Sequence, residues 1–86
     1  MRLIWSEPAL DDLEAIAARA PRAAAHVFES VVWLAEQIFP RAFRRVEGRP
    51  KDHVQVVAPY TVVYRIDGED LTVLRIFDGR RLLNRP

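Results

Sequence analysis

The sequence predicts an α+β fold: a short N-terminal strand, an antiparallel helical hairpin and then a three-stranded antiparallel meander. Two changes along the chain support this prediction. Apolar residues recur at helical spacing between residues 7 and 39, and after Pro40 the pattern changes to alternating, β-branched segments. In addition, Asp67 and Gly68 separate two of these later segments, and an Asp-Gly pair is typical of a β-hairpin turn.

The predicted strand, residues 1–5, is mostly apolar and ends at a helix start signal. Ser6 stands at the N-cap position, where its hydroxyl can accept a hydrogen bond from the first turn. Pro8 fits that turn because its missing N–H is not needed there. The helix ends by Ala20, since Pro21 disfavours a helical residue before it. Its predicted buried face consists of Leu10, Leu13, Ile16 and Ala17.

A second helix is predicted from Pro21 to about Phe39, just before Pro40. Trp33 falls on the polar side of this helix. The pattern is compatible with a Trp33 that contacts a partner and equally with one whose ring lies flat on its own domain. The helix has one broad apolar side, which comprises Ala24, Val27, Phe28, Val31, Val32, Leu34, Ala35, Ile38 and Phe39.

The predicted meander comprises residues 53–58, 60–66 and 71–77, preceded by a basic loop with Gly48 and Pro50. Unless a bulge intervenes, alternation assigns the residues of the last two strands to two faces. The face expected under the helices holds Tyr60, Val62, Tyr64, Ile66, Leu71, Val73, Arg75 and Phe77, with Arg75 paired to a helix acid. The other face holds Thr61, Val63, Arg65, Thr72, Leu74 and Ile76, which is too apolar to face water alone and indicates a bound partner.

The composition excludes several classes of protein. Residues 1–86 are enough for one small domain, and half of them are hydrophobic. Without cysteine there is no disulfide scaffold and no thiolate zinc site, and two isolated histidines, His26 and His53, do not make a metal site. No signal peptide or membrane-spanning run is evident. We therefore expect a cytoplasmic protein that needs no metal and no cofactor.

The charge is unevenly distributed, although the net charge is only +1. In residues 1–40 three arginines face six acids, whereas in residues 41–86 ten basic residues face six acids. This polarity indicates an anionic partner near the second half of the chain. For a single cluster of basic residues taken alone, a solvated basic loop would explain the positive charge equally well. The excess comes from Arg41, Arg44, Arg45, Arg49 and Lys51, and from Arg80, Arg81 and Arg85 near the C-terminus.

The order and spacing of several short motifs resemble the ParE/RelE superfamily of toxins from type II toxin–antitoxin pairs. No single motif is specific, but together they extend over nearly the whole chain. Residues 49–53 depart from the usual segment of the family. The motifs are Trp5-Ser6-Glu7-Pro8-Ala9, Asp11-Asp12-Leu13, Ile38-Phe39-Pro40-Arg41, Val46-Glu47-Gly48, Pro59-Tyr60-Thr61-Val62-Val63-Tyr64-Arg65 and Leu74-Arg75-Ile76-Phe77-Asp78-Gly79-Arg80-Arg81.

The resemblance implies a compact α+β domain, neutralised by a cognate antitoxin whose tail wraps around the toxin. It implies one of two activities. RelE-like members cut messenger RNA on the ribosome, whereas ParE-like members trap DNA gyrase on DNA. RelE-like toxins use lysines on the second strand and an arginine directly after the tyrosine of the third, but here residues 53–57 lack lysine and Thr61 follows Tyr60. Arg81 does match the family's last arginine, yet no tyrosine follows it.

The family pattern therefore favours a ParE-like gyrase inhibitor that breaks no bond itself. One alternative is a ribosome-dependent messenger RNA endonuclease with Arg81, Arg80 and His53 as catalytic candidates. Another is an inactive member that only binds its antitoxin. For target binding we expect Arg80, Arg81, Arg45, Arg49 and Lys51, and for antitoxin binding Trp33, Arg41, Arg44 and Arg65.

Overall fold

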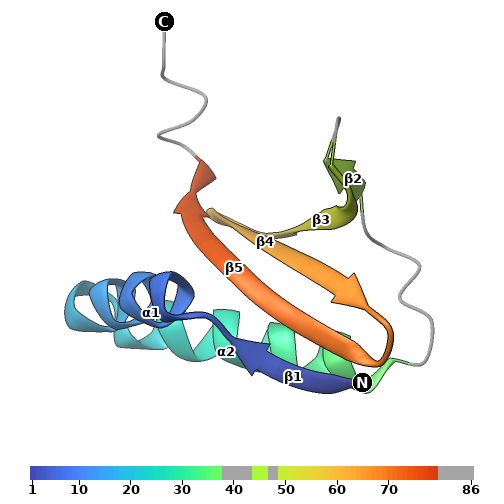
Figure 1. The fold of residues 1–86 in the computed structure, drawn as a ribbon. Helices are drawn as coiled ribbons and strands as arrows, with labels where there is room; N and C mark the ends of the chain where they lie inside the picture. The colour runs from blue at the N-terminus through green and yellow to red at the C-terminus, as the bar shows by residue number, and fades with distance from the viewer. Residues whose placement is uncertain (38–43, 47–48, 80–86) are drawn as a thin grey trace, which may run out of the picture.

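The computed structural model describes residues 1–37, 44–46 and 49–79, and the side chains of residues 1–37 and 52–79. Two helices pack against a five-stranded sheet of strand order β1-β5-β4-β3-β2 (Figure 1). β1 runs parallel to β5, and the other neighbours are antiparallel. The elements are β1 (Arg2–Trp5), α1 (Glu7–Arg19), α2 (Pro21–Glu36), β2 (Arg44–Val46), β3 (Arg49–Val57), β4 (Tyr60–Asp67) and β5 (Asp70–Asp78).

The helical hairpin begins and turns where the sequence predicts. The Ser6 hydroxyl caps α1 by accepting a hydrogen bond from the Ala9 amide at 3.3 Å, and it donates to the Leu74 carbonyl at 3.1 Å. Ala20 is the one residue between the helices, and Pro21 opens α2. The cap therefore joins the start of α1 to β5 and fixes the hairpin on the sheet.

The buried face of the hairpin is narrower than the prediction. In α1 only Ala9 and Ile16 are buried, whereas Leu10 is 43% exposed and Ala17 is exposed. α1 packs chiefly against α2 and β5, so its buried stripe covers a small arc. Phe28 of α2, expected in the core, is 45% exposed and stacks on Trp5 with ring centroids 5.8 Å apart. The predicted helix residues Ile38 and Phe39 lie outside the described residues.

The hydrophobic core lies between the hairpin and the centre of the sheet. Val62 and Tyr64 of β4 and Leu71 and Val73 of β5 are fully buried. From α2 the core receives Ala24, Val27, Val31, Leu34 and Ala35. This agrees with the predicted period of both helix and strand.

A β-bulge between β4 and β5 changes the predicted face assignment. Tyr64 pairs with Val73 but Val63 pairs with Arg75, so Leu74 is an extra residue in β5. From that point the side chains of β5 are inverted. Ile76, predicted on the outer face, is buried in the core, and the prediction that Arg75 and Phe77 lie on the core face is wrong. Before the bulge the predicted alternation is confirmed.

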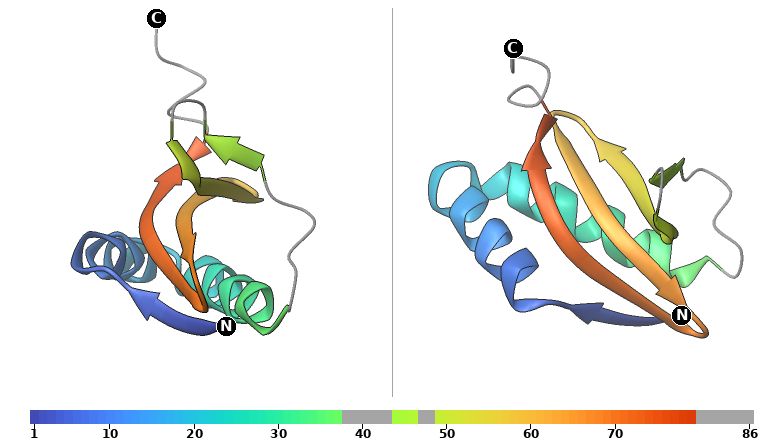
Figure 2. Two further views of the ribbon diagram at one scale, coloured as in Figure 1. Left: turned by 45° about the vertical axis from the view of Figure 1, so that its right-hand side comes forward. Right: turned by 45° about the horizontal axis from the view of Figure 1, so that its top comes forward.

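The turns agree with the sequence, but the segment before the meander does not. Gly68, with φ +61°, is the first of two loop residues between the paired Asp67 and Asp70. The predicted basic loop in fact contains β2 and the first residues of β3, because Arg45 pairs with His53. The sheet twists and curls strongly from β1 to β2 (Figure 2). No helix among the described residues is long and apolar enough to cross a membrane.

Candidate functional site

The basic residues of the predicted loop are brought to one edge of the sheet. Arg44 and Arg45 lie in β2, and Arg49 and Lys51 lie in β3, which pairs with it. We call these four residues and their two strands the basic hairpin. Arg41 lies outside the described residues. The hairpin forms the sheet edge farthest from β1 in strand order.

The end of β5 is fixed tightly against the turn between β3 and β4. The Gly79 amide donates a hydrogen bond to the Pro59 carbonyl at 2.7 Å. A Cβ atom on Gly79 would lie 3.1 Å from that carbonyl oxygen and 3.3 Å from Thr61 Oγ1, so the position favours glycine. Gly79 is the last described residue, and the predicted site residues Arg80 and Arg81 follow it outside the described range.

Arg65, predicted to meet the antitoxin, forms an ion pair within the sheet. Its Nε lies 2.7 Å from Oδ1 of Asp52, its direct cross-strand partner. Asp52 is only 1% exposed, whereas the Arg65 side chain is 42% exposed. A carboxylate so deeply buried depends on this charged hydrogen bond. Arg65 therefore neutralises Asp52 while part of its side chain stays exposed.

His53, the candidate base of the alternative nuclease reading, packs inside the domain. It is 6% exposed, and its ring centroid lies 5.4 Å from that of Tyr64. Burial raises the pKa of Tyr64, so its hydroxyl stays protonated at neutral pH. The pair lies on the core side of β3 and β4, where a bound phosphate would have to displace the packing between strand and helix.

Asp12 joins α1 to the bulge in β5. It accepts hydrogen bonds from Arg75 Nε and Nη2 at 2.8 and 3.2 Å, and from the Ile76 amide at 2.9 Å. The sequence correctly predicts a helix acid as the partner of Arg75. Burial alone would raise the pKa of Asp12, but the hydrogen bonds from Arg75 and Ile76, with the Arg75 charge, together lower it below its usual 3.8.

Asp12→Ala should therefore lower the free energy of unfolding at pH 7 by about 1–3 kcal/mol, chiefly because the part-buried Ile76 amide loses its acceptor. The pKa of the Asp12 carboxyl is lower in the folded protein than in the unfolded chain. Its ionised form therefore stabilises the fold fully at pH values above the pKa of the unfolded chain, and this stabilisation is lost as the pH falls through the pKa of the folded protein. Urea unfolding between pH 7 and pH 2 should show the gap between wild type and variant closing at acid pH. Asp11→Ala, the exposed neighbour, is the control. A gap that persists unchanged at pH 2 would contradict this role.

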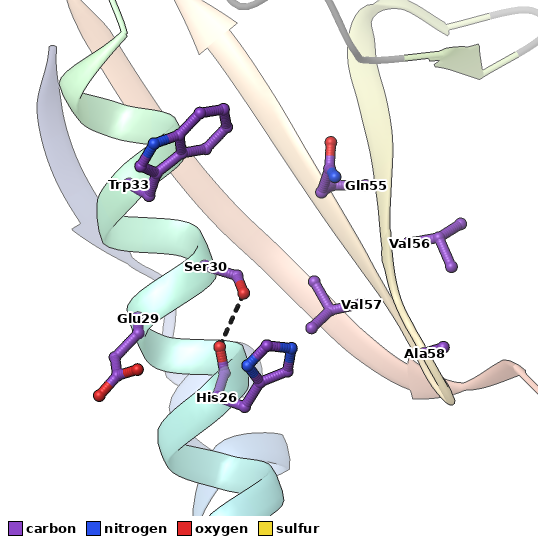
Figure 3. A pocket seen from close by; sticks show the side chains of 8 residues that line it. All are labelled: His26, Glu29, Ser30, Trp33, Gln55, Val56, Val57 and Ala58. Carbon is purple, nitrogen blue, oxygen red and sulfur yellow. Dashed lines mark hydrogen bonds between the residues drawn. The ribbon is translucent and has the colours of Figure 1, made fainter.

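Trp33 is the most prominent exposed aromatic residue of the described chain, with 57% of its surface accessible. It lies on α2 beside a groove that α2 forms with β3 (Figure 3). Within the described residues no group of three histidine, cysteine, aspartate or glutamate side chains is placed to hold a metal ion.

Comparison with known proteins gives the family. Residues 3–83 match the family model described as the ParE toxin of the type II toxin–antitoxin system parDE. The chain belongs to the ParE toxin family. A curated relative, toxin ParE3 of Caulobacter vibrioides, is 49% identical over 43 residues, which is 49% of this chain and 43% of the relative. The match thus spans less than half of that relative.

Solved structures share the ParE/RelE fold at low sequence identity. The chromosomal ParDE system of P. aeruginosa has a TM-score of 0.72 at 22% identity, over 91% of this chain and 95% of that one. The RelBE2 toxin–antitoxin complex of Mycobacterium tuberculosis has a TM-score of 0.75 at 20% identity, over 90% and 88%. The YoeB/ParE toxin from Agrobacterium tumefaciens has 0.73 at 19%, over 88% and 96%. At these sequence identities the solved structures show the shared fold.

Proposed function

We propose that this ParE family member inhibits DNA gyrase, and thereby replication, without breaking a bond itself. One observation supports the proposal: the arginines of β4 and β5 are bound by the domain's own acids. Arg65 is held by Asp52 and Arg75 by Asp12, while His53 is buried. A metal-free ribonuclease needs an accessible base and cations gathered around the scissile phosphate.

The remaining cations suit binding of a large anionic target. The basic hairpin and the residues after Gly79 carry most of the positive charge of the second half of the chain. A gyrase–DNA complex presents phosphates and acidic protein surface together, and Arg suits both through its forked, bidentate hydrogen bonds. Such contacts hold a complex in place and require no catalytic group on the toxin.

The test is to induce the protein in a bacterial host and follow the synthesis of DNA, RNA and protein in parallel. We expect DNA synthesis to stop first, together with a DNA-damage response, while translation continues. Early loss of translation with cleaved transcripts would instead favour a RelE-like messenger RNA endonuclease that uses Arg80, Arg81 and His53. That second candidate is kept because the RelBE2 complex shares the fold. Normal growth after induction would indicate a member that only binds its antitoxin.

The proposal also covers the protein partner and the cellular compartment. The P. aeruginosa ParDE and M. tuberculosis RelBE2 structures come from toxin–antitoxin systems. We infer that this toxin likewise acts in the cytoplasm and is held inactive by an antitoxin encoded beside it, which stabilises the plasmid or chromosome that carries both. The antitoxin tail folds as it binds, which costs part of the contact energy.

A further inference from the structure

The last residues of β5 are held from two sides. On one side Asp12 of α1 accepts hydrogen bonds from the Ile76 amide at 2.9 Å and from Arg75 Nε at 2.8 Å. On the other side the Gly79 amide donates to the Pro59 carbonyl, in the turn between β3 and β4, at 2.7 Å. The end of β5 lies beside this turn (Figure 2). A helix and a turn that are distant in sequence therefore fix the same short segment.

The side chains of this segment add to the hold. The guanidinium carbon of Arg75 lies 5.2 Å from the centroid of the Phe77 ring, at the distance of a cation–π contact. Beyond the extra residue Leu74, Arg75 pairs with Val63 and Phe77 pairs with Thr61 of β4. A β-bulge bends its strand and changes the direction of the side chains that follow it. The bulge and these contacts together define the course of β5 up to its last residue.

Gly79 is the point where a close approach of backbone to backbone requires a small residue. A Cβ atom there would lie 3.1 Å from the Pro59 carbonyl oxygen and 3.3 Å from Thr61 Oγ1. Of the described glycines only Gly68 has a positive φ, so Gly79 is needed for space and not for a left-handed backbone. The oxygen of Pro59 belongs to the backbone and cannot rotate away. A side chain at position 79 must therefore move the strand end from the turn by a few tenths of an ångström.

Covalent geometry ties Arg80 and Arg81 to this point. Successive Cα atoms are about 3.8 Å apart, so the Cα atom of Arg81 is within about 8 Å of that of Gly79 in every conformation. Bidentate contacts of arginine with an anion depend on direction as well as distance. A misplacement of about 1 Å in a preorganised site can cost about a hundredfold in activity. The direction of the backbone at Gly79 thus limits where the two guanidinium groups can reach.

We propose that Gly79 is a positioning residue for target binding. Its close contact with Pro59 sets the direction in which the chain leaves β5, and Arg80 and Arg81 engage the anionic target from that direction. Asp12 contributes from the helical side, because it holds the same segment of β5. The inference rests on the proposed function, since it takes the two arginines as target-binding groups. It assigns no contact with the target to Gly79 itself.

The test measures the concentration of purified toxin that gives half-maximal accumulation of cleaved DNA on gyrase. Gly79→Ala should raise this concentration by about four- to tenfold, the loss expected for a shift of a few tenths of an ångström. Gly79→Val carries a larger side chain at the same place and should raise it further. Growth inhibition at matched toxin levels should follow the same order. Circular dichroism and the melting temperature establish that both variants are folded.

Gly68→Ala is the matched control, because it adds the same methyl group in the turn at the other end of β5. Gly68 has φ +61°, where alanine is strained, but nothing lies within 4 Å of its Cβ position. The variant should lose at least about 4 °C in melting temperature and keep the potency of wild type. A loss of potency equal to that of Gly79→Ala would show that potency merely follows stability, and would overturn the positioning role.

A double-mutant cycle separates positioning from general damage. Arg80→Lys with Arg81→Lys keeps the charge but loses the forked, direction-dependent contact. In this background Gly79→Ala should change the half-maximal concentration by less than about twofold, because Gly79 acts through the arginines. An undiminished effect there, or wild-type potency of Gly79→Ala and Gly79→Val, overturns the proposal and leaves the gyrase assignment intact.

Failure of the proposed function gives a different result. Wild-type toxin would then inhibit growth without holding cleaved DNA on gyrase. The same cycle measured as growth inhibition still decides the role of Gly79, since it depends on the arginines and not on the identity of the anionic target. A smaller effect of Gly79→Ala in the lysine background supports positioning, and an equal effect in both backgrounds overturns it.

Discussion

Replacing Arg80 and Arg81 together with alanine should abolish growth inhibition while the toxin still folds and still binds its antitoxin. Both arginines follow Gly79, whose amide is held 2.7 Å from the Pro59 carbonyl at the end of β5. Loss of two bidentate anion contacts removes the proposed grip on the target. Surface substitutions change the free energy of unfolding by only about 0.5 kcal/mol, so thermal stability should hardly change.

The matched control is Arg19→Ala with Arg22→Ala, which removes the same charge from the exposed ends of α1 and α2. This variant should remain as toxic as wild type. Growth curves after induction, melting temperature and antitoxin affinity are measured for both. If the Arg80/Arg81 variant folds, binds antitoxin and kills at the wild-type dose, these arginines are not in the target site. The basic hairpin then becomes the better candidate.

Tyr64→Ala should nearly unfold the toxin. Tyr64 is fully buried at the centre of β4 and packs against His53 with ring centroids 5.4 Å apart. Truncating a buried aromatic side chain costs about 3–5 kcal/mol, because the domain loses the transfer energy and keeps a cavity. For a domain of this size each kcal/mol lowers the melting temperature by about 4–8 °C. A fall of more than about 12 °C is therefore expected by calorimetry or circular dichroism.

Phe28→Ala removes an aromatic ring from a half-exposed site instead of a buried one. Phe28 stacks on Trp5 at the surface, so its truncation removes far less buried area. We expect a loss well below that of Tyr64→Ala. Equal losses from the two variants would show that the core does not lie where Tyr64, Val62 and Leu71 place it.

Much of the fold follows from local signals in the sequence. Ser6 and Pro8 predict the start of α1, Pro21 the start of α2, and Gly68 the hairpin between β4 and β5. Each acts through its own backbone chemistry, so no knowledge of distant contacts is required.

The errors come from distant contacts. The bulge at Leu74 lies where β5 is hydrogen-bonded to the N-cap Ser6 and to Asp12 of α1, and it moves Ile76 into the core against the simple alternation. β2 is formed by pairing with β3, and its short sequence carries no strand signal of its own. The burial of Asp52 is equally non-local, since it needs Arg65 on the neighbouring strand.

The candidate site was likewise predictable only where its signals are local. Exposure of Trp33 follows from helical periodicity, because the residue falls on the polar side of α2. The groove follows only from the distance between α2 and β3, which no local pattern encodes. Sequence reasoning therefore found the tryptophan and missed the groove beside it.

The central claim, inhibition of gyrase without bond cleavage by the toxin, is tested most directly with purified components. Toxin is incubated with gyrase, ATP and supercoiled DNA, and in parallel with translating ribosomes and messenger RNA. We predict that cleaved DNA covalently held by gyrase accumulates and that added antitoxin reverses this effect. The Arg80/Arg81 variant should not produce it, and the messenger RNA should stay intact. Intact gyrase activity together with ribosome-dependent cleavage of the messenger would contradict it.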